Sequence, residues 1–297
     1  MMNDFLPNFL IVGAAKSGTT SLFDQLCRHP EVFKPYIKEP GYFIPQNQYS
    51  SINTWEEYKN IFKGADKFKA RGEASVTYLF DEKSPELIKE KLGEEVRILI
   101  ILRNPIDMSY SLWQHRQRDL KEELDFFEAL KLRDTKNPNA ISVKSIEYDW
   151  DYLNRAKYYK QVKRYMEKFK HVKVLIFEDY IKKNDIQFKE VCEFLGINPK
   201  VSVELESKNT AYKPRFPFIQ KALTYQLSIK EILKKILPHD FLVKLKSKVE
   251  NLNKVETENQ KLSMEDRINL APLFKEDVES LSKLIGKELK VYWKEFN

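Results

Sequence analysis

The stretch Phe9-Leu10-Ile11-Val12-Gly13-Ala14-Ala15-Lys16-Ser17-Gly18-Thr19-Thr20 decides the fold of this chain. Apolar residues lead into a turn that holds two glycines, a lysine and three hydroxyl side chains, and residues 21–26 continue with apolar residues at helical spacing. The pattern predicts a buried strand, an anion-binding loop and a helix. Backbone N–H groups and the start of the helix would then point at one spot, where a phosphate can bind beside Lys16.

The position of the lysine separates this loop from a Walker A motif. A Walker loop has its lysine directly after the second glycine. Here Thr19 follows Gly18, and the lysine stands two positions before that glycine. An ordinary strand-to-helix connection is the alternative for a turn of this composition.

Further strands follow along the chain. Residues 96–102 form an almost unbroken apolar run with many β-branched side chains, as expected of a parallel strand covered on both faces. Residues 172–177 resemble it, and residues 70–79 predict a short strand that becomes a loop, with Gly72 and Glu73 at the turn. Helical spacing occurs in 55–63, 84–92, 107–118, 124–132, 158–169 and 188–195. We therefore predict an α/β fold, a single domain with a central parallel sheet flanked by helices.

The ligand of such a sheet binds beyond the carboxyl ends of its strands. The loop 13–20 and Arg103 both fall at such ends. After residues 208–215 the pattern predicts helices to the terminus. Residues 217–262 include two basic amphipathic segments, which predict a helical lid or insertion, or helices with one solvated basic face. Peripheral contact with a membrane is a further use of such helices.

Composition limits the class of protein. The chain has 297 residues, 42% of them hydrophobic and 32% charged, and a net charge of +7, which favours anionic ligands without choosing among them. No segment approaches the roughly 18 consecutive apolar residues of a membrane span, and the N-terminus has no secretory pattern. We expect a cytoplasmic protein that binds no nucleic acid, with Cys27 and Cys192 as packing residues.

Three motifs together carry a resemblance to a known family. The loop 13–22, the segment from Arg103-Asn104-Pro105 to Tyr110-Ser111, and Lys38-Glu39-Pro40-Gly41-Tyr42-Phe43 occur in the order found in sulfotransferases that use 3′-phosphoadenosine 5′-phosphosulfate (PAPS). The sequence resembles their bacterial and heparan-sulfate-type branch. The resemblance implies a P-loop-like sulfotransferase fold, PAPS as co-substrate, adenosine 3′,5′-bisphosphate (PAP) as product, and no metal ion.

The resemblance also implies residue roles. The residues expected to bind the phosphosulfate and the 3′-phosphate are Lys16, Ser17, Gly18, Thr19, Thr20, Ser21, Arg103 and Ser111. The catalytic residues would be Glu39, as the base that takes the proton of the acceptor hydroxyl, and Lys16, which would stabilise charge on the bridging oxygen. Two of these residues have a structural alternative. Glu39 would be a surface residue of a turn, and Arg103 would form an ion pair at the end of its strand.

Other candidates are less specific. The basic loop with Tyr212, Lys213 and Arg215 would close over the nucleotide, or would simply be solvated. The candidates for contact with the acceptor are Lys38, Glu73, Tyr78 and His115. His115, one helical turn after Ser111, is either a second base or a packing residue. The resemblance gives the acceptor only as a hydroxyl of a glycan, a lipid or a small alcohol, and it leaves the oligomeric state open.

Two rival hypotheses remain from the sequence. A P-loop-type kinase or nucleoside triphosphatase would use the anion loop together with Phe177-Glu178-Asp179, which imitates the end of a Walker B strand. A nucleotide-binding or nucleic-acid-binding module would use the basic helices and catalyse no transfer. The displaced lysine and the arginine at a strand end favour the sulfotransferase.

Overall fold

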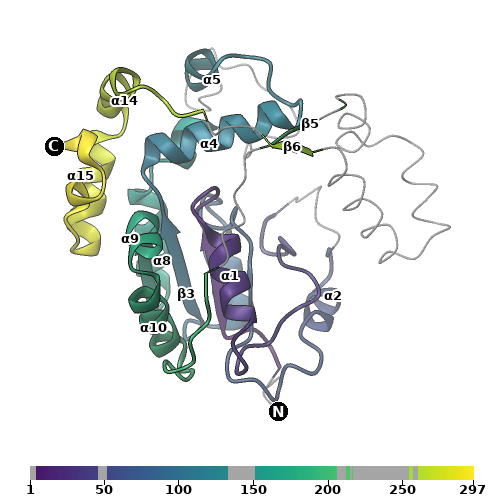
Figure 1. The fold of residues 1–297 in the computed structure, drawn as a ribbon. Coiled ribbons are helices and arrows are strands. Elements are labelled where there is room, and N and C mark those ends of the chain that lie inside the picture. The colour runs from purple at the N-terminus through teal and green to yellow at the C-terminus, as the bar shows by residue number, and fades with distance from the viewer. Residues whose placement is uncertain are drawn as a thin grey trace.

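The computed structural model describes residues 5–45, 52–132, 151–205, 212–214, 216, 254–256 and 260–297, with the backbone alone for 212–214 and 254–256. Four parallel strands form the central sheet (Figure 1), in the order β2-β1-β3-β4. They are β1 (Phe9–Gly13), β2 (Gly72–Ala74), β3 (Arg97–Leu102) and β4 (Val172–Ile176). The α/β fold with a parallel sheet, predicted from the sequence, is confirmed.

The sheet is covered on both faces, which explains its unbroken apolar strands. Side chains alternate between two cores because successive residues of a strand point to opposite faces. One core contains Phe9, Ile11, Leu99, Ile101 and Leu175, packed against α1 (Thr19–Cys27) and α10 (Asn184–Leu195). The other contains Leu10, Val12, Ile98, Ile100 and Leu102, packed against α3 (Ser84–Leu92), α4 (Pro105–Arg118) and α8 (Tyr159–Lys168).

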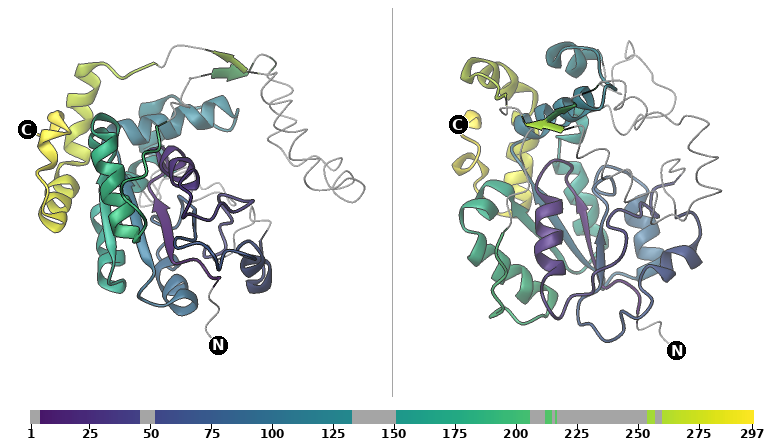
Figure 2. Two further views of the ribbon diagram at one scale, coloured as in Figure 1. Left: turned by 60° about the horizontal axis from the view of Figure 1, so that its bottom comes forward. Right: turned by 45° about the vertical axis from the view of Figure 1, so that its right-hand side comes forward.

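The remaining helices complete the described part of the chain. They are α2 (Trp55–Asn60), α5 (Phe126–Leu132), α7 (Tyr152–Arg155), α9 (Phe177–Lys182), α14 (Met264–Leu270), α15 (Lys275–Ile285) and three turns of 3₁₀ helix at Ala271–Leu273, Leu289–Val291 and Lys294–Phe296. Figures 1 and 2 show α4 crossing the end of the sheet where β3 ends, and α15 beside α8. The C-terminal helix α15 thus packs against α8, one of the helices that cover the sheet.

The second strand corrects one sequence expectation. Gly72 and Glu73 lie within β2, paired with β1, and the turn comes later, where the Tyr78 N–H donates to the Ser75 carbonyl at 3.2 Å. A Cβ at position 72 would lie 2.4 Å from the Phe9 carbonyl oxygen. The glycine therefore serves the close approach of two strands, a role that a sequence pattern cannot distinguish from a turn.

The C-terminal part is also not purely helical, contrary to the expectation. The backbone of β5 (Tyr212–Pro214) pairs antiparallel with β6 (Lys254–Glu256), with Lys213 opposite Val255. Each strand is too short to show an alternating apolar pattern, and its partner lies about forty residues away in sequence, so only the pairing defines it. Most of the predicted lid at 217–262 lies outside the described residues.

Both cysteines are free thiols packed in the core that contains α10. Burial raises the pKa of Cys27 to about 12 and that of Cys192 to about 11, which suppresses the reactive thiolate. Their assignment as packing residues is confirmed. Within the described residues, every helix is too short or too polar to cross a membrane.

Candidate functional site

The loop between β1 and α1 is held at its beginning by close packing. A Cβ at Gly13 would lie 2.6 Å from the Leu79 Cβ, so a larger residue does not fit. The next N–H, that of Ala14, donates to the Ile101 carbonyl at 2.7 Å. The loop therefore leaves the sheet in a fixed direction, at the carboxyl ends of β1 and β3.

The loop ends at a glycine in the left-handed region. Gly18 has φ 86° and ψ 12°, and a Cβ there would lie 2.8 Å from the Phe177 ring. Among the described residues, no side chain caps α1, so the N–H groups of its first turn keep their hydrogen-bonding capacity for a ligand. Thr19 is buried, Ser21 is half-buried and Thr20 is exposed at this helix start. The geometry is that of an anion-binding loop.

Lys16 also has a left-handed backbone, with φ 59°. Its side chain is half-buried, and burial lowers its pKa to about 8, with the positive charges of Arg118 and Arg103 contributing. A nearby anion would stabilise the charged form of this lysine. The neighbouring Ser17 is buried, and its hydroxyl donates to the Ala15 carbonyl at 3.2 Å, within the fold.

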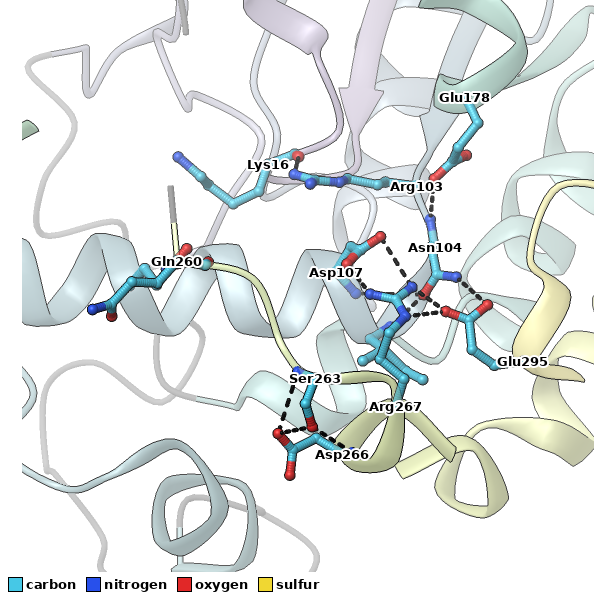
Figure 3. A network of polar contacts seen from close by, with 12 residues as sticks. Lys16, Arg103, Asn104, Asp107, Glu178, Gln260, Ser263, Asp266, Arg267 and Glu295 are labelled. Atoms are coloured by element: carbon cyan, nitrogen blue, oxygen red, sulfur yellow. Dashed lines mark hydrogen bonds and ion pairs between the residues drawn. The ribbon is translucent and has the colours of Figure 1, made fainter. Parts of the chain in front are cut away.

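Arg103 follows β3 and reaches back to the loop. Its Nη1 donates to the Lys16 carbonyl at 3.2 Å, and its guanidinium lies over the Phe177 ring, 5.3 Å from the centroid. Figure 3 shows the Arg103 guanidinium at the loop backbone and the Lys16 side chain extending away from it. The two positive charges therefore lie at separate places beside the same loop. Two anionic groups of one ligand would require such a separation.

Asn104 begins α4. Its Oδ1 accepts hydrogen bonds from the N–H groups of Ile106 at 3.0 Å and Asp107 at 3.4 Å, which is the usual N-cap arrangement. Its own N–H donates to Glu178 Oε1 at 2.9 Å, and Glu178 Oε2 accepts from the Trp293 indole at 3.0 Å. Both oxygens of Glu178, the residue that suggested a Walker B strand end, are therefore engaged within the fold.

Helix α4 carries the other predicted residues of this region. Ser111 and His115 are both half-buried and stand one helical turn apart. Burial holds the pKa of His115 well below its usual range, and the positive charges of Lys16 and Arg118 lower it further. His115 is therefore a neutral imidazole near the loop lysine, with its Nδ1 3.5 Å from Asp119.

The Lys38-Glu39 segment comes to the same place from the other side. Lys38 Nζ donates to Thr20 Oγ1 at 2.8 Å and to Glu39 Oε1 at 2.6 Å. The Lys38 carbonyl accepts from the Ala74 N–H at 3.1 Å, which fixes the segment against β2. The Glu39 side chain is 46% exposed, so its carboxylate is accessible beside the first turn of α1.

Glu73 and Tyr78 lie beneath that segment, and both are fully buried. Ser75 Oγ donates to Glu73 Oε2 at 2.8 Å and accepts from the Gly41 N–H at 3.1 Å, while the Tyr78 hydroxyl accepts from the Phe43 N–H at 3.4 Å. These side chains support the backbone that carries Glu39. Contact between either of them and an acceptor stays a prediction.

The predicted nucleotide-closing loop is only partly described. Tyr212 and Lys213 are placed by their backbone in β5, and Arg215 lies outside the described residues. The sequence pattern did not predict the structural roles of Phe177, which fills the space between Gly18 and Arg103, or of Trp293 and Glu295. The aromatic residue directly after an apolar strand was the one available signal for Phe177.

A parallel sheet with an anion loop after β1 and an arginine after β3 defines a P-loop-like protein. Residues 6–236 match the sulfotransferase domain family, so the chain belongs to that family. The crystal structure of a sulfotransferase from Alicyclobacillus acidocaldarius superposes with a TM-score of 0.71 at 26% identity, covering 97% of this chain and 98% of that one.

Curated relatives are larger proteins. The chain is 26% identical to the mouse bifunctional heparan sulfate N-deacetylase/N-sulfotransferase 4 over 210 residues, which are 66% of this chain and 23% of that protein. It is 32% identical to the human bifunctional heparan sulfate N-deacetylase/N-sulfotransferase 2 over 121 residues, which are 38% of this chain and 13% of that protein. The chain thus matches less than a quarter of the length of either relative.

Proposed function

We propose that this protein transfers a sulfuryl group from PAPS to an acceptor hydroxyl. The observation that carries the proposal is that Arg103 donates to the Lys16 carbonyl and that Lys38, paired with Glu39, donates to Thr20 of the same loop, at the carboxyl edge of the sheet. Membership of the sulfotransferase domain family supports it and disfavours a kinase.

Two cations would divide the nucleotide between them. The N–H groups at the start of α1, together with Lys16, would bind the 5′-phosphosulfate, and Arg103 with Ser111 would bind the 3′-phosphate. The lowered pKa of Lys16 is consistent with this role, because a bound anion restores the charged form and gains its full attraction.

The transfer itself needs a base and a stabilised leaving group. Glu39 would take the proton of the acceptor hydroxyl while its oxygen forms a bond to sulfur. The bond from sulfur to the bridging oxygen breaks, and PAP leaves with the electron pair, next to the Lys16 ammonium. Catalysis of this kind rests on positioning and electrostatic stabilisation, as in phosphoryl transfer.

The decisive experiment is a PAPS-dependent transfer assay over carbohydrate, lipid and small-alcohol acceptors. Carbohydrates come first because the curated relatives are named as heparan sulfate N-deacetylase/N-sulfotransferases. The variant Glu39→Gln should lose about 10²- to 10⁴-fold in turnover, the usual contribution of a general base, while binding PAP normally. Near-normal turnover in that variant would remove Glu39 from the mechanism.

Nucleotide selectivity tests the second anion site. PAP should raise the melting temperature more than ADP or AMP does at equal concentration, because only PAP places a phosphate at Arg103. The variant Arg103→Ala should abolish the difference. Arg97→Ala, at the opposite end of the same strand, is the matched control and should retain it. Equal protection of the unmodified protein by PAP and ADP would contradict the proposal.

A further inference from the structure

The peptide between Arg103 and Asn104 is held from both sides. Its carbonyl accepts a hydrogen bond from the Tyr158 hydroxyl at 3.1 Å, and its N–H donates to Glu178 Oε1 at 2.9 Å. Tyr158 is fully buried, and β4 leads directly into the helix that carries Glu178. The backbone from which the Arg103 side chain extends is therefore fixed by two distant parts of the chain.

The last residues of the described chain complete this arrangement. The Trp293 indole, which is fully buried, donates to Glu178 Oε2 at 3.0 Å. Asn104 Nδ2 donates to Glu295 Oε2 at 3.1 Å (Figure 3). The support of the peptide N–H thus depends on Trp293, through Glu178, and the position of the Asn104 side chain depends on Glu295. These contacts join residues separated by 115 and 191 positions in sequence.

Arg267 ties the same network to helix α4. Its guanidinium forms an ion pair with Glu295 and donates from Nη1 to Asp107 Oδ1 at 2.6 Å. Asp107 lies in the first turn of α4, three residues after the cap. Since a forked guanidinium between two carboxylates restricts both, the start of α4 and the C-terminal segment are joined as one unit.

We propose that Trp293 and Glu295 are positioning residues for Arg103 and so set the preference of this protein for a nucleotide with a 3′-phosphate. The inference rests on the function proposed above. Trp293 acts by holding the Glu178 carboxylate, and Glu295 acts by holding the Asn104 side chain. Burial raises the pKa of Glu178, whereas the hydrogen bonds from Asn104 and Trp293 lower it, so loss of the indole donor would weaken the acceptor that fixes the peptide.

The test compares PAP with AMP, which lacks the 3′-phosphate, by calorimetric titration of the full chain. Trp293→Phe removes the indole N–H while retaining an aromatic ring, and Glu295→Ala removes the carboxylate. We expect either change to weaken PAP about tenfold and AMP less than twofold. Lys294→Ala, an exposed neighbour in the same turn, is the matched control and should change neither.

A milder variant covers the case in which Glu295→Ala does not fold. Glu295→Gln keeps an oxygen that can accept from Asn104, and it should retain the PAP preference. An equal loss of PAP and AMP affinity in Trp293→Phe would indicate general loosening and overturn the inference, as would unchanged affinities. A wild-type protein that binds PAP no better than AMP would overturn the proposed function as well, so the two failures are distinguishable.

Discussion

Glu73 is a fully buried carboxyl group in the strand next to the proposed base. Burial raises its pKa from an ordinary value of 4.5 to about 8, and the negative charge of Glu39 contributes in the same direction. Hydrogen bonds from Ser75, Tyr78 and Tyr58 oppose the shift. A protonated Glu73 would add no buried charge beneath the Lys38-Glu39 segment, which suits a supporting role.

This shift predicts how stability depends on pH. The folded state keeps a proton that the unfolded chain releases above its ordinary pKa. The stabilisation is therefore fully present below about pH 4.5 and is lost as pH rises through about 8. Glu73→Gln should gain stability relative to the wild type between pH 5 and pH 9, by a few kcal/mol at about 1.4 kcal/mol per pKa unit. Urea unfolding at several pH values measures this; a constant difference would contradict it.

At the scale of elements, the loop and the end of β3 are coupled through Phe177. The ring lies 2.8 Å from the position that a Cβ of Gly18 would take, and the Arg103 guanidinium stacks on it. Phe177 is the first residue of α9, directly after β4, so the strand order of the sheet brings it between the loop that follows β1 and Arg103. The two proposed anion sites therefore share one packing residue.

Gly18→Ala should disturb both sites. We expect a loss of stability of more than about 1 kcal/mol, because a left-handed alanine is strained by roughly that amount and the methyl group also meets Phe177. PAP affinity should fall as well. Gly196→Ala is the matched control, since Gly196 has φ 72° and, apart from its neighbours in the chain, no described residue has a heavy atom within 4 Å of the position that its new methyl group would take. It should lose stability by strain alone and bind PAP normally in the same titration.

At the scale of the whole molecule, the C-terminal helices support the end of the sheet at which Arg103 lies. Asp277 of α15 accepts from the N–H groups of Tyr158 at 2.7 Å and Tyr159 at 3.2 Å, so it caps α8 from outside. Tyr158 in turn holds the Arg103 carbonyl. A helix nearly 120 residues away thereby orients a residue that contacts the site.

Asp277→Ala should remove that cap. The cost of losing a capping carboxylate is about 0.5–2 kcal/mol, measured as a shift of the urea midpoint. Glu276→Ala, an exposed position in the same turn, should cost less than about 0.5 kcal/mol. Equal effects of the two substitutions would show that the contact between α15 and α8 contributes nothing specific.

The sequence alone determined the β1–loop–α1 unit, the apolar strands after it, and the motifs with Lys16, Glu39 and Arg103. These features are local, because a strand, a turn and a helix start are specified by neighbouring residues. The family resemblance drew on the same local motifs.

Only the tertiary structure decided that Gly72 and Glu73 belong to a strand and that Glu73 is buried. It also decided that Trp293 contacts Glu178 and that Glu295 contacts Asn104 at the start of α4. The pairing of the short strands β5 and β6 was likewise decided only by the tertiary structure. Each depends on partners far away in sequence, and no local pattern encodes which surfaces the order of the sheet brings together.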